Sequence, residues 1–576
     1  MAYPPHPRWG CSVEARALVS DLERADLNPA LEHAGIQALQ KISRLSSESY
    51  TLVQTDLGKE INITILQAAF LLARGPRTIH HLANPPVLKS CIRLMKTVEG
   101  LPPTEITPFS HEYGYLCFKL FIVVLNVCLL ERWDKLEEVL TLCKDKELAV
   151  HVYISDMVAF IVGKQFEALK SGEGCDWVLG WSASANGRRQ PTLLPLSDIS
   201  TLFNLIWDDR KKFLLSQAPF TRKVTGLSGL MFVFSRYIAH ERKKNLEWKL
   251  LQGKLYEIAL RYALVADARQ RRATVDVIDA NKCTGDWYNT PKHIDTEDSR
   301  LILGAYIQTL TRDEEIHETL HPPVLLRLVA LSVNDSTQEL LPEVVRWTIE
   351  YGWRMFLSLD DEEDNFEMFI KFFMSAFSYL LSPPLHPPVR LIPLTQTKVI
   401  EVMRKKGLLD WIARALIQLR PGTTYAESEA NGDVHESLIL FGKSLTEVVP
   451  QRELERCFGQ YVPEWWKVHR YFASIPAGRS SDHRDHYEHC GHAWLKVAEL
   501  LGLEPAIDEY ASENYYNGEA ARSSGARFGC TGCIHTWYCD DRCKRMDWRL
   551  VHPHIHSHDE SAPALRDLLS GFGHGF

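Results

Sequence analysis

The dominant pattern along the chain is the return of apolar residues at positions i, i+3, i+4 and i+7, which gathers them on one face of a helix. The pattern predicts helix after helix from about residue 12 to residue 510. Alternating apolar and polar residues between tight turns, the mark of half-buried strands, are scarce. The sequence therefore predicts an all-α fold. The clearest helices are expected at residues 12–27, 60–74, 113–133, 148–169, 247–268, 343–357, 366–381 and 434–448.

Two consecutive prolines precede three of the apolar segments, at Pro85-Pro86, Pro322-Pro323 and Pro387-Pro388. Proline fits the first helical turn, where its missing N–H would be unpaired anyway, so these pairs predict helix starts. Their spacings of 237 and 65 residues show no fixed period. Successive amphipathic helices suit a solenoid, in which each helix pair buries its face on its neighbours. We expect an irregular armadillo-like or HEAT-like array, with a compact, non-repetitive helical domain as the alternative.

Changes in composition divide the chain into four parts. A helical domain is expected over residues 1–473, followed by a linker and helical connector over 474–511. A small and polar stretch then leads into a cysteine-rich module over 512–558, and residues 559–576 form a C-terminal tail.

Composition and charge narrow the class of protein. Of the 576 residues, 45% are hydrophobic and 24% are charged, as in ordinary globular proteins. A net charge of -8 argues against broad capture of nucleic acid, which needs a basic face. The longest apolar run, residues 116–130, is shorter than the roughly 20 residues of a bilayer span and predicts a buried core helix. Because the N-terminus also lacks the apolar region of a secretory signal, we expect an intracellular protein, cytoplasmic or nuclear, without a transmembrane segment.

Cysteine is the residue type whose distribution stands out. The chain holds 13, an odd number for a closed disulfide framework. Nine of them lie between Cys11 and Cys490, and we expect these to be small buried hydrophobes of a reduced protein. The remaining four fall within fourteen positions: Cys530, Cys533, Cys539 and Cys543.

The spacing of these four cysteines and of two later histidines predicts a metal site. Cys530 and Cys533 form a Cys-x2-Cys turn, which aims two thiolates at one point, and His552 and His556 have the i, i+4 spacing of a helical ligand pair. Four such ligands in a closed tetrahedron make a structural zinc site without an open position for catalysis. The alternative is four buried or free thiols in a reduced tail.

The string Cys-x2-Cys-x5-Cys-x3-Cys-x3-Asp-Trp-x3-His-x3-His resembles the second half of a MYND-type zinc finger. The whole chain, a helical body that ends in such a finger, is also similar to a group of fungal proteins. The resemblance covers about 45 residues, and His556 stands where the family usually has cysteine. It implies one zinc held by the four ligands named above. The matching positions are Cys530, Cys533, Tyr538, Cys539, Cys543, Asp547, Trp548 and His552.

The resemblance leaves the family's other zinc site incomplete. Cys539 and Cys543 would share that site with an upstream Cys-x2-Cys pair, but Asn514-Tyr-Tyr-Asn517 stands at the expected distance. Either the site is lost, or distant ligands complete it. Cys490 and His492 are the candidate additional ligands, within a run that also holds His483, His486 and His489. One zinc is expected, and two if this run contributes.

In some family members the finger grips proline-rich peptides of the type Pro-x-Leu-x-Pro through a tryptophan of its last helix. Trp548 matches that tryptophan, and Lys544 stands where a polar contact residue is common. These two residues are the candidate peptide-binding positions; the alternative for Trp548 is a place in the core of the module. A protein or peptide partner, proline-rich in this case, is therefore expected, and neither a membrane nor nucleic acid.

Enzyme signatures are weak. The strand-rich SET domain that accompanies some MYND fingers is not indicated, and Gly442-Lys443-Ser444 lacks the first glycine of a phosphate loop. Gly226-Leu-Ser228-Gly229 lacks the spacing of a nucleophile elbow. No catalytic residue is predicted. We expect a zinc-binding scaffold for protein–protein interaction; the alternatives are an enzyme with its active site in the helical body and a transcription or chromatin adaptor.

Overall fold

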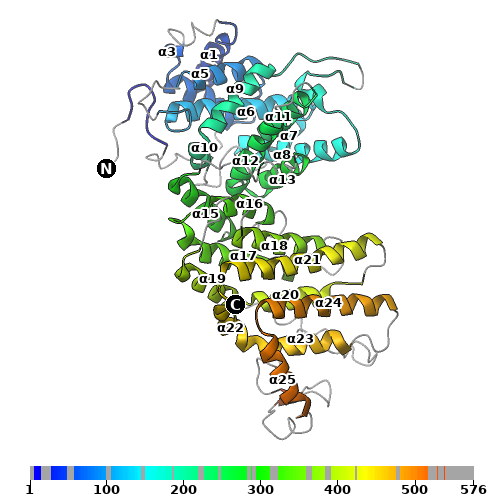
Figure 1. Cartoon of the computed structure of the whole chain (residues 1–576). Helices are drawn as coiled ribbons and strands as arrows, with labels where there is room; N and C mark the ends of the chain where they lie inside the picture. Colours follow the sequence, from blue (N-terminus) through cyan, green and yellow to red (C-terminus); the bar gives the residue numbers. More distant parts are fainter. Residues whose placement is uncertain are drawn as a thin grey trace. The chain divides into compact units, whose positions relative to one another are not determined.

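Helices make up nearly all the regular structure of the described residues in this computed structural model (Figure 1), which confirms the prediction of an all-α fold. The remaining regular elements are two very short strands near the C-terminus. The structure describes residues 5–13, 27–48, 58–98, 106–143, 149–184, 187–217, 226–243, 248–281, 287, 294–311, 322–358, 366–382, 391–421, 425–474, 481–516, 528–529 and 537–538.

The described residues form two compact units, which meet in sequence at Thr337 and Gln338. No change in composition marks this boundary, which divides the helical domain expected over residues 1–473. The second unit also includes most of the expected connector, residues 474–511, because helices there pack on the helices before them. The two units are described separately below.

Unit 1 is built around one long apolar helix, α6 (Glu112–Arg132). Helices α4, α5, α8 and α11 pack against it, and nearly every side chain between its ends is buried. By length and composition α6 could cross a bilayer, but 94% of its most apolar stretch is buried inside unit 1. Burial of that kind supports the predicted core helix.

Of the residues that the structure describes, those in unit 1 form α1 (Pro29–Arg44), α3 (Gly58–Glu60), α4 (Ile63–Leu71), η2 (Leu72–Arg74), η3 (Ile79–Leu82), α5 (Pro85–Lys96), α6, α7 (Leu136–Cys143), α8 (Val150–Lys170), η4 (Asp176–Leu179), α9 (Leu196–Asp208), α10 (Arg210–Gln217), α11 (Ser228–Glu241), α12 (Trp248–Val265), α13 (Ala268–Ala280), α15 (Thr296–Thr311) and α16 (Pro322–Ser332).

Unit 2 contains η5 (Gln338–Leu340), α17 (Leu341–Ser358), α18 (Phe366–Leu381), α19 (Pro393–Lys405), α20 (Leu408–Gln418), α21 (Tyr425–Val448), α22 (Gln451–Phe458), η6 (Gly459–Tyr461), α23 (Val462–Ser474), α24 (Ser481–Leu500), α25 (Glu504–Tyr516), β1 (Phe528–Gly529) and β2 (Trp537–Tyr538).

Two of the three proline pairs begin helices as predicted. Helix α5 starts at Pro85 and α16 starts at Pro322, where the fixed φ of proline suits the first turn. The third pair, Pro387-Pro388, lies outside the described residues, as does most of the helix expected at residues 12–27. The helix expected at 434–448 begins nine residues earlier, at Tyr425.

Helices α18, α21 and α24 form a row of parallel helices, and α18 and α21 lie side by side in Figure 1. Lys371 of α18 pairs with Asp433 of α21, and one turn later Ser375 hydrogen-bonds Ser437 at 3.3 Å. The contacts advance in the same direction along both helices, with an offset of 62 residues. In the next pair, Cys490 of α24 lies 3.4 Å from the His435 ring of α21, an offset of 55 residues. We call this set the α18–α21–α24 row.

Gly442 allows α21 and α24 to approach closely farther along this row. A Cβ at this position would lie 2.8 Å from Cδ1 of Leu500, which is too close for an ordinary contact. The contact from Gly442 to Leu500 follows that from His435 to Cys490 along both helices, so α21 and α24 are parallel as well.

A second row of parallel helices consists of α17, α19 and α22. The Trp353 indole of α17 donates to the carbonyl of Lys406 just after α19, at 3.0 Å. The thiol of Cys457 in α22 lies 3.6 Å from the carbonyl of Ile400. A tight corner links α19 to α20, where Gly407 adopts a φ of 67° that favours glycine.

Large aromatic side chains fill the core of unit 2. The buried Trp411 of α20 contacts the rings of Phe356, Phe369 and Phe373, which come from α17 and α18. In the last helices, the ring of Trp494 in α24 stacks on the ring of Trp465 in α23. Burial of such rings contributes much of the packing free energy of a helical unit.

Candidate functional site

The ligands of the expected zinc finger lie outside the described residues. They are Cys530, Cys533, Cys539, Cys543, His552 and His556, together with the candidate peptide-binding residues Lys544 and Trp548. The donor set of two thiols and two imidazoles at Cys530, Cys533, His552 and His556 fits the ligand preference of Zn²⁺.

Two short strands are described within this part of the chain. Phe528 pairs with Tyr538 and Gly529 with Trp537, in antiparallel register. In sequence, Gly529 directly precedes Cys530, and Tyr538 directly precedes Cys539. The pairing therefore brings together the two backbone segments that lead into the Cys-x2-Cys pair and into the Cys-x3-Cys pair.

The described residues bring cysteine and histidine together at the contact between α21 and α24. Sγ of Cys490 lies 3.4 Å from Nε2 of His435 and 3.7 Å from Nε2 of His486, one turn earlier in α24. Nε2 of His486 also lies 3.0 Å from the carbonyl of Leu419, just after α20. A nitrogen that donates to that carbonyl cannot accept the thiol proton, so the Cys490 thiol donates to His435.

Burial sets the protonation states at this contact. It raises the pKa of the Cys490 thiol to about 12. Burial, together with the nearby His486 and His489, lowers the pKa of His435 to about 4. At neutral pH the pair is therefore a neutral thiol hydrogen-bonded to a neutral imidazole. Only a thiolate is a strong nucleophile, so a neutral thiol here does not form a Cys–His catalytic pair. The contact is a structural hydrogen bond that links α21 and α24.

The two sequence candidates for extra zinc ligands are not brought together. Cys490 is fully buried, whereas His492 is exposed, because positions two residues apart are about 200° apart around a helix. In the part of the chain that the structure describes, no group of three or more His, Cys, Asp or Glu side chains is placed to hold a metal ion. The hydrogen bond from His486 to Leu419 gives one reason, because it occupies the ring nitrogen that faces Cys490.

Comparisons of the chain with family models, with curated proteins and with solved structures found no match. The MYND-type resemblance therefore rests on residue types and their spacing alone.

His435 is a member of the α21–α24 contact that sequence reasoning missed. It lies 55 residues before Cys490, inside a helix whose pattern indicates only an apolar face. A constant number of residues between contacting positions on successive helices of the row would have identified His435 as the partner of Cys490. This number varies from 62 to 55 residues, so it leaves no regular period in the sequence.

Unit 1 gives the Gly226-Leu-Ser228-Gly229 segment a structural role. Ser228 is fully buried at the start of α11, and its hydroxyl donates to Oε1 of Gln270 at 2.5 Å. The backbone N–H of Leu227 donates to the Tyr262 hydroxyl at 2.9 Å. The N–H of Ser228 also donates to Oε1 of Gln270, at 3.2 Å, so the N–H groups at the start of the helix are paired, and the buried Ser228 side chain has a structural role there.

A second buried cluster of unit 1 is ionic. The guanidinium of Arg261 donates to both carboxylate oxygens of Asp298, each at 2.7 Å, and to Glu257 at 3.1 Å. Arg210 also donates to Glu257, at 3.1 Å. Burial alone would lower the pKa of Arg261, but the hydrogen bonds and charges of its two carboxylate partners raise it. Each charge is paired, and the cluster joins α10, α12 and α15.

Proposed function

We propose that this chain is a zinc-binding scaffold for protein–protein interaction. In this proposal an armadillo-like or HEAT-like helical body offers an extended contact surface, and a C-terminal MYND-type finger adds a second contact site for a peptide. The chain would act by binding and not by catalysis.

The observation that carries the proposal is the α18–α21–α24 row. Parallel helices in successive contact repeat the same outward face, and in solenoid proteins such faces make long binding surfaces. Side chains of all three helices remain exposed along it, including Phe372, Leu440 and Leu495. A long surface of this kind suits an extended partner more than a small substrate.

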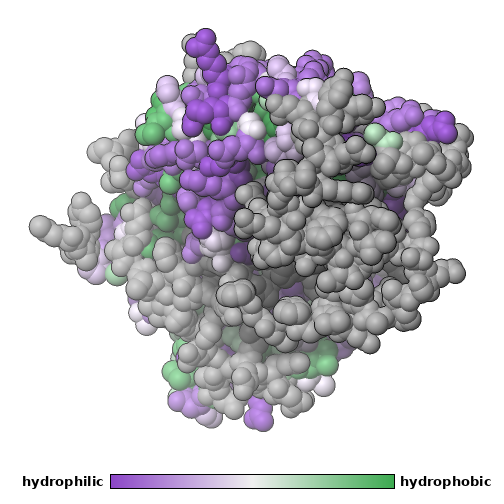
Figure 2. Space-filling view, turned by 90° about the horizontal axis from the view of Figure 1, so that it is seen from below, coloured by the Kyte–Doolittle hydropathy of each residue, from purple (hydrophilic) through white to green (hydrophobic). Residues whose placement is uncertain are grey.

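Hydrophilic and hydrophobic residues alternate on the exposed surface of the described residues, so no single large apolar face marks a contact site. The site has to be located by substitution of individual residues. Among the residues coloured in Figure 2, hydrophilic ones form the larger patches and hydrophobic ones form smaller groups beside them. This is the usual composition of a protein surface that binds its partners through a few positions.

The finger supplies the second part of the proposal. One zinc would be held by Cys530, Cys533, His552 and His556 and would stabilise a module too small to fold on its own core. Trp548, supported by Lys544, would then contact a proline-rich peptide.

The state of the cysteines supports an intracellular location. The eight cysteines within the described residues are all free thiols, and seven of them are buried. Proteins of reducing compartments keep thiols in this form.

Capture of partners with the full chain as bait tests the proposed function. The baits are the wild type, Trp548→Ala for the finger, and Phe372→Asp with Leu440→Asp for the helical row, each compared by quantitative mass spectrometry. We expect one set of proteins to be lost with the first variant or with the second. If both variants retain every protein that the wild type captures, neither surface is a contact site and the proposal is wrong.

A further inference from the structure

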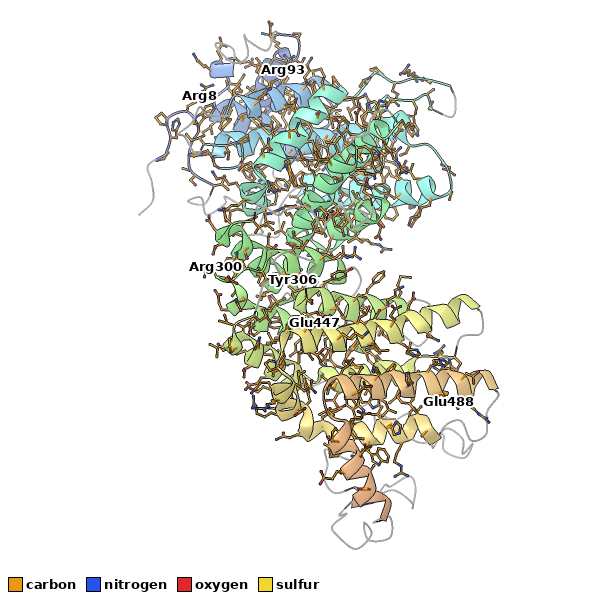
Figure 3. All side chains as sticks on the ribbon, in the orientation of Figure 1. Arg8, Arg93, Arg300, Tyr306, Glu447 and Glu488 are labelled. Carbon is orange, nitrogen blue, oxygen red and sulfur yellow. The ribbon has the colours of Figure 1, made fainter. Side chains whose placement is uncertain are left out.

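The segment of unit 1 between η4 and α9 carries an exposed threonine, Thr192, between two residues that are fixed to the body of the unit. On one side, the N–H of Leu193 donates to the carbonyl of Leu179 at 3.0 Å, and the Leu193 side chain is buried. On the other side, the carbonyl of Pro191 accepts a hydrogen bond from Arg132 at 2.8 Å. The Thr192 side chain itself is exposed, and its hydroxyl has no hydrogen-bond partner among the described residues. Figure 3 draws the described side chains of this segment where it leads into α9.

Two exposed arginines precede this threonine by four and three residues, at Arg188 and Arg189. They lie in a short hairpin, in which Ala183 and Arg189 form an antiparallel bridge. The N–H of Ser184 also donates to the carbonyl of Arg188 at 2.9 Å. Neither guanidinium has an ion-pair partner within the described residues. The hairpin therefore fixes the backbone of both arginines and leaves their side chains open to another molecule.

Arg132, at the end of α6, is a third cation beside the threonine. Its Nη1 donates to the carbonyl of Val178 and its Nη2 to the carbonyl of Pro191, each at 2.8 Å. The side chain is half-buried, and this burial lowers the pKa of the guanidinium, which the charges of Cys128 and Glu131 offset only in part. Two carbonyl oxygens do not neutralise a cation, so an anion next to Pro191 would meet a positive charge there.

We propose that Thr192 is a phosphorylation site for a serine/threonine protein kinase that recognises arginine before its target residue. Kinases select their substrates by charge patterns of this kind. In the reaction, the Thr192 hydroxyl oxygen attacks the γ-phosphorus of ATP, and the bond from that phosphorus to the bridging oxygen of the leaving ADP breaks. The hydroxyl proton passes to the catalytic aspartate of the kinase. This inference goes beyond the proposed scaffold function and does not depend on it.

A similar run of residues in α13 shows why burial decides between candidate sites. Arg271 and Arg272 precede Thr274 by three and two residues, so the sequence alone makes this threonine as good a candidate as Thr192. Thr274 is fully buried, however, and its hydroxyl donates to the carbonyl of Gln270 at 2.7 Å. The Arg271 side chain is buried too. A kinase therefore cannot reach this run in the folded protein, whereas it can reach the arginines and the hydroxyl of the Thr192 segment.

The surroundings of Thr192 also determine what the modification does. A phosphate adds a charge of about -1.5 to -2 and three acceptor oxygens. Because Arg132 already donates to the carbonyl of Pro191, its guanidinium lies within one peptide unit of the modified residue. We expect Arg132, together with Arg189 from the hairpin, to form charge-assisted hydrogen bonds with the phosphate. Phosphorylation would thus fasten residues 188–193 to the end of α6 and order this surface of unit 1.

Phosphorylation of the full chain in vitro tests the site. The full chain and a synthetic peptide of residues 186–196 are each incubated with ATP, Mg²⁺ and the catalytic domain of a calmodulin-dependent protein kinase, as a representative of the arginine-directed class. Mass spectrometry then locates the phosphate. We expect more than half of the folded chains to carry it on Thr192, and none to carry it on Thr274. The proposal is wrong if Thr192 of the folded chain stays unmodified, whether or not the peptide is modified.

Substitutions test the recognition by arginine. Arg189→Gln should slow phosphorylation of Thr192 by about tenfold or more, as expected for the loss of a hydrogen bond between charged groups. Both residues are exposed, so folding should be retained. The matched control is Arg242→Gln, at an exposed arginine just after α11, which should leave the rate unchanged. Equal rates for Arg189→Gln and Arg242→Gln would show that the arginine before the threonine is not read.

Hydrogen exchange tests the contact between the phosphate and unit 1. We expect the backbone N–H groups of residues 188–193 to exchange about tenfold more slowly in the phosphorylated chain than in the unmodified one, because the segment opens less often. In Arg132→Gln the phosphate should slow this exchange much less. Equal exchange in the phosphorylated and unmodified wild type would overturn the assigned contact.

Discussion

Sγ of Cys490 lies 3.4 Å from Nε2 of His435, and this contact joins the last two helices of the α18–α21–α24 row. The two residues are 55 positions apart in sequence. Each is in an electrically neutral form because burial opposes its charged form. The contact therefore holds only while His435 stays unprotonated, which makes the end of the row sensitive to acid.

We expect unit 2 to lose stability as the pH falls below about 6.5. The pKa of His435 is lowered from 6.5 to about 4 in the folded protein, so the unfolded chain takes up the proton first. The stability that this group contributes is present above pH 6.5 and is lost as the pH falls towards 4. Linkage makes the loss about 2 kcal/mol between pH 7.5 and pH 5. Urea unfolding at the two pH values, followed by circular dichroism, measures it.

His435→Gln should reduce that pH dependence by the same amount, whatever its effect on stability at pH 7.5. His492→Gln is the matched control, because His492 is exposed on the adjacent helix. We expect His492→Gln to keep the wild-type dependence on pH. If His435→Gln also kept it in full, the neutral His435 would not be its cause. His469, whose pKa burial also lowers, should add a smaller share of the same sign.

Asp298→Ala should destabilise unit 1 strongly. It removes the carboxylate that accepts two hydrogen bonds from Arg261, and it leaves a buried guanidinium with one partner fewer. Breaking a buried pair in this way costs about 3–5 kcal/mol. The neighbouring Glu297 is the control, since its pair with Lys211 is exposed and should contribute about 1 kcal/mol or less. Similar unfolding midpoints for Asp298→Ala and Glu297→Ala would contradict the assigned role of the buried cluster.

Trp494→Ala should destabilise unit 2 more than Trp466→Ala. The rings of Trp494 and Trp465 lie 3.7 Å apart and nearly parallel, and the Trp494 indole donates to the Trp465 carbonyl at 3.2 Å. Removal of a fully buried tryptophan costs about 3–5 kcal/mol. Trp466 is only half-buried, so its loss should cost less than half as much. Differential scanning calorimetry of the two variants compares them, and a larger loss for Trp466→Ala would be inconsistent with this core.

Metal content tests the expected finger. We expect mass spectrometry of the purified full chain to find one zinc per molecule, absent in Cys533→Ser and retained in Cys539→Ser. The helical circular dichroism should stay nearly constant in Cys533→Ser, because the metal stabilises the tail and not the body. Two zincs in the wild type, one of them lost in Cys539→Ser, would mean that distant ligands complete the other site. A wild type without zinc would disprove the finger.

The helical class and many of the helices could be predicted from the amino-acid sequence alone, because an amphipathic helix needs only its own residues to show its buried face. Residues 366–381, for example, were predicted with the bounds that α18 has. The proline pairs located the starts of α5 and α16 for the same reason, since a fixed φ acts locally. The zinc ligands are also predicted from a short stretch of sequence, from the spacing of cysteine and histidine. Because they lie outside the described residues, they stay a prediction.

Which helices contact one another could not be predicted from the sequence and is known from the fold. The boundary at Thr337 and Gln338 and the parallel rows of unit 2 depend on contacts between residues 50 or more positions apart. A single sequence does not show such contacts when the offsets vary. His435 is the clearest case, since its partner Cys490 is visible only in the fold.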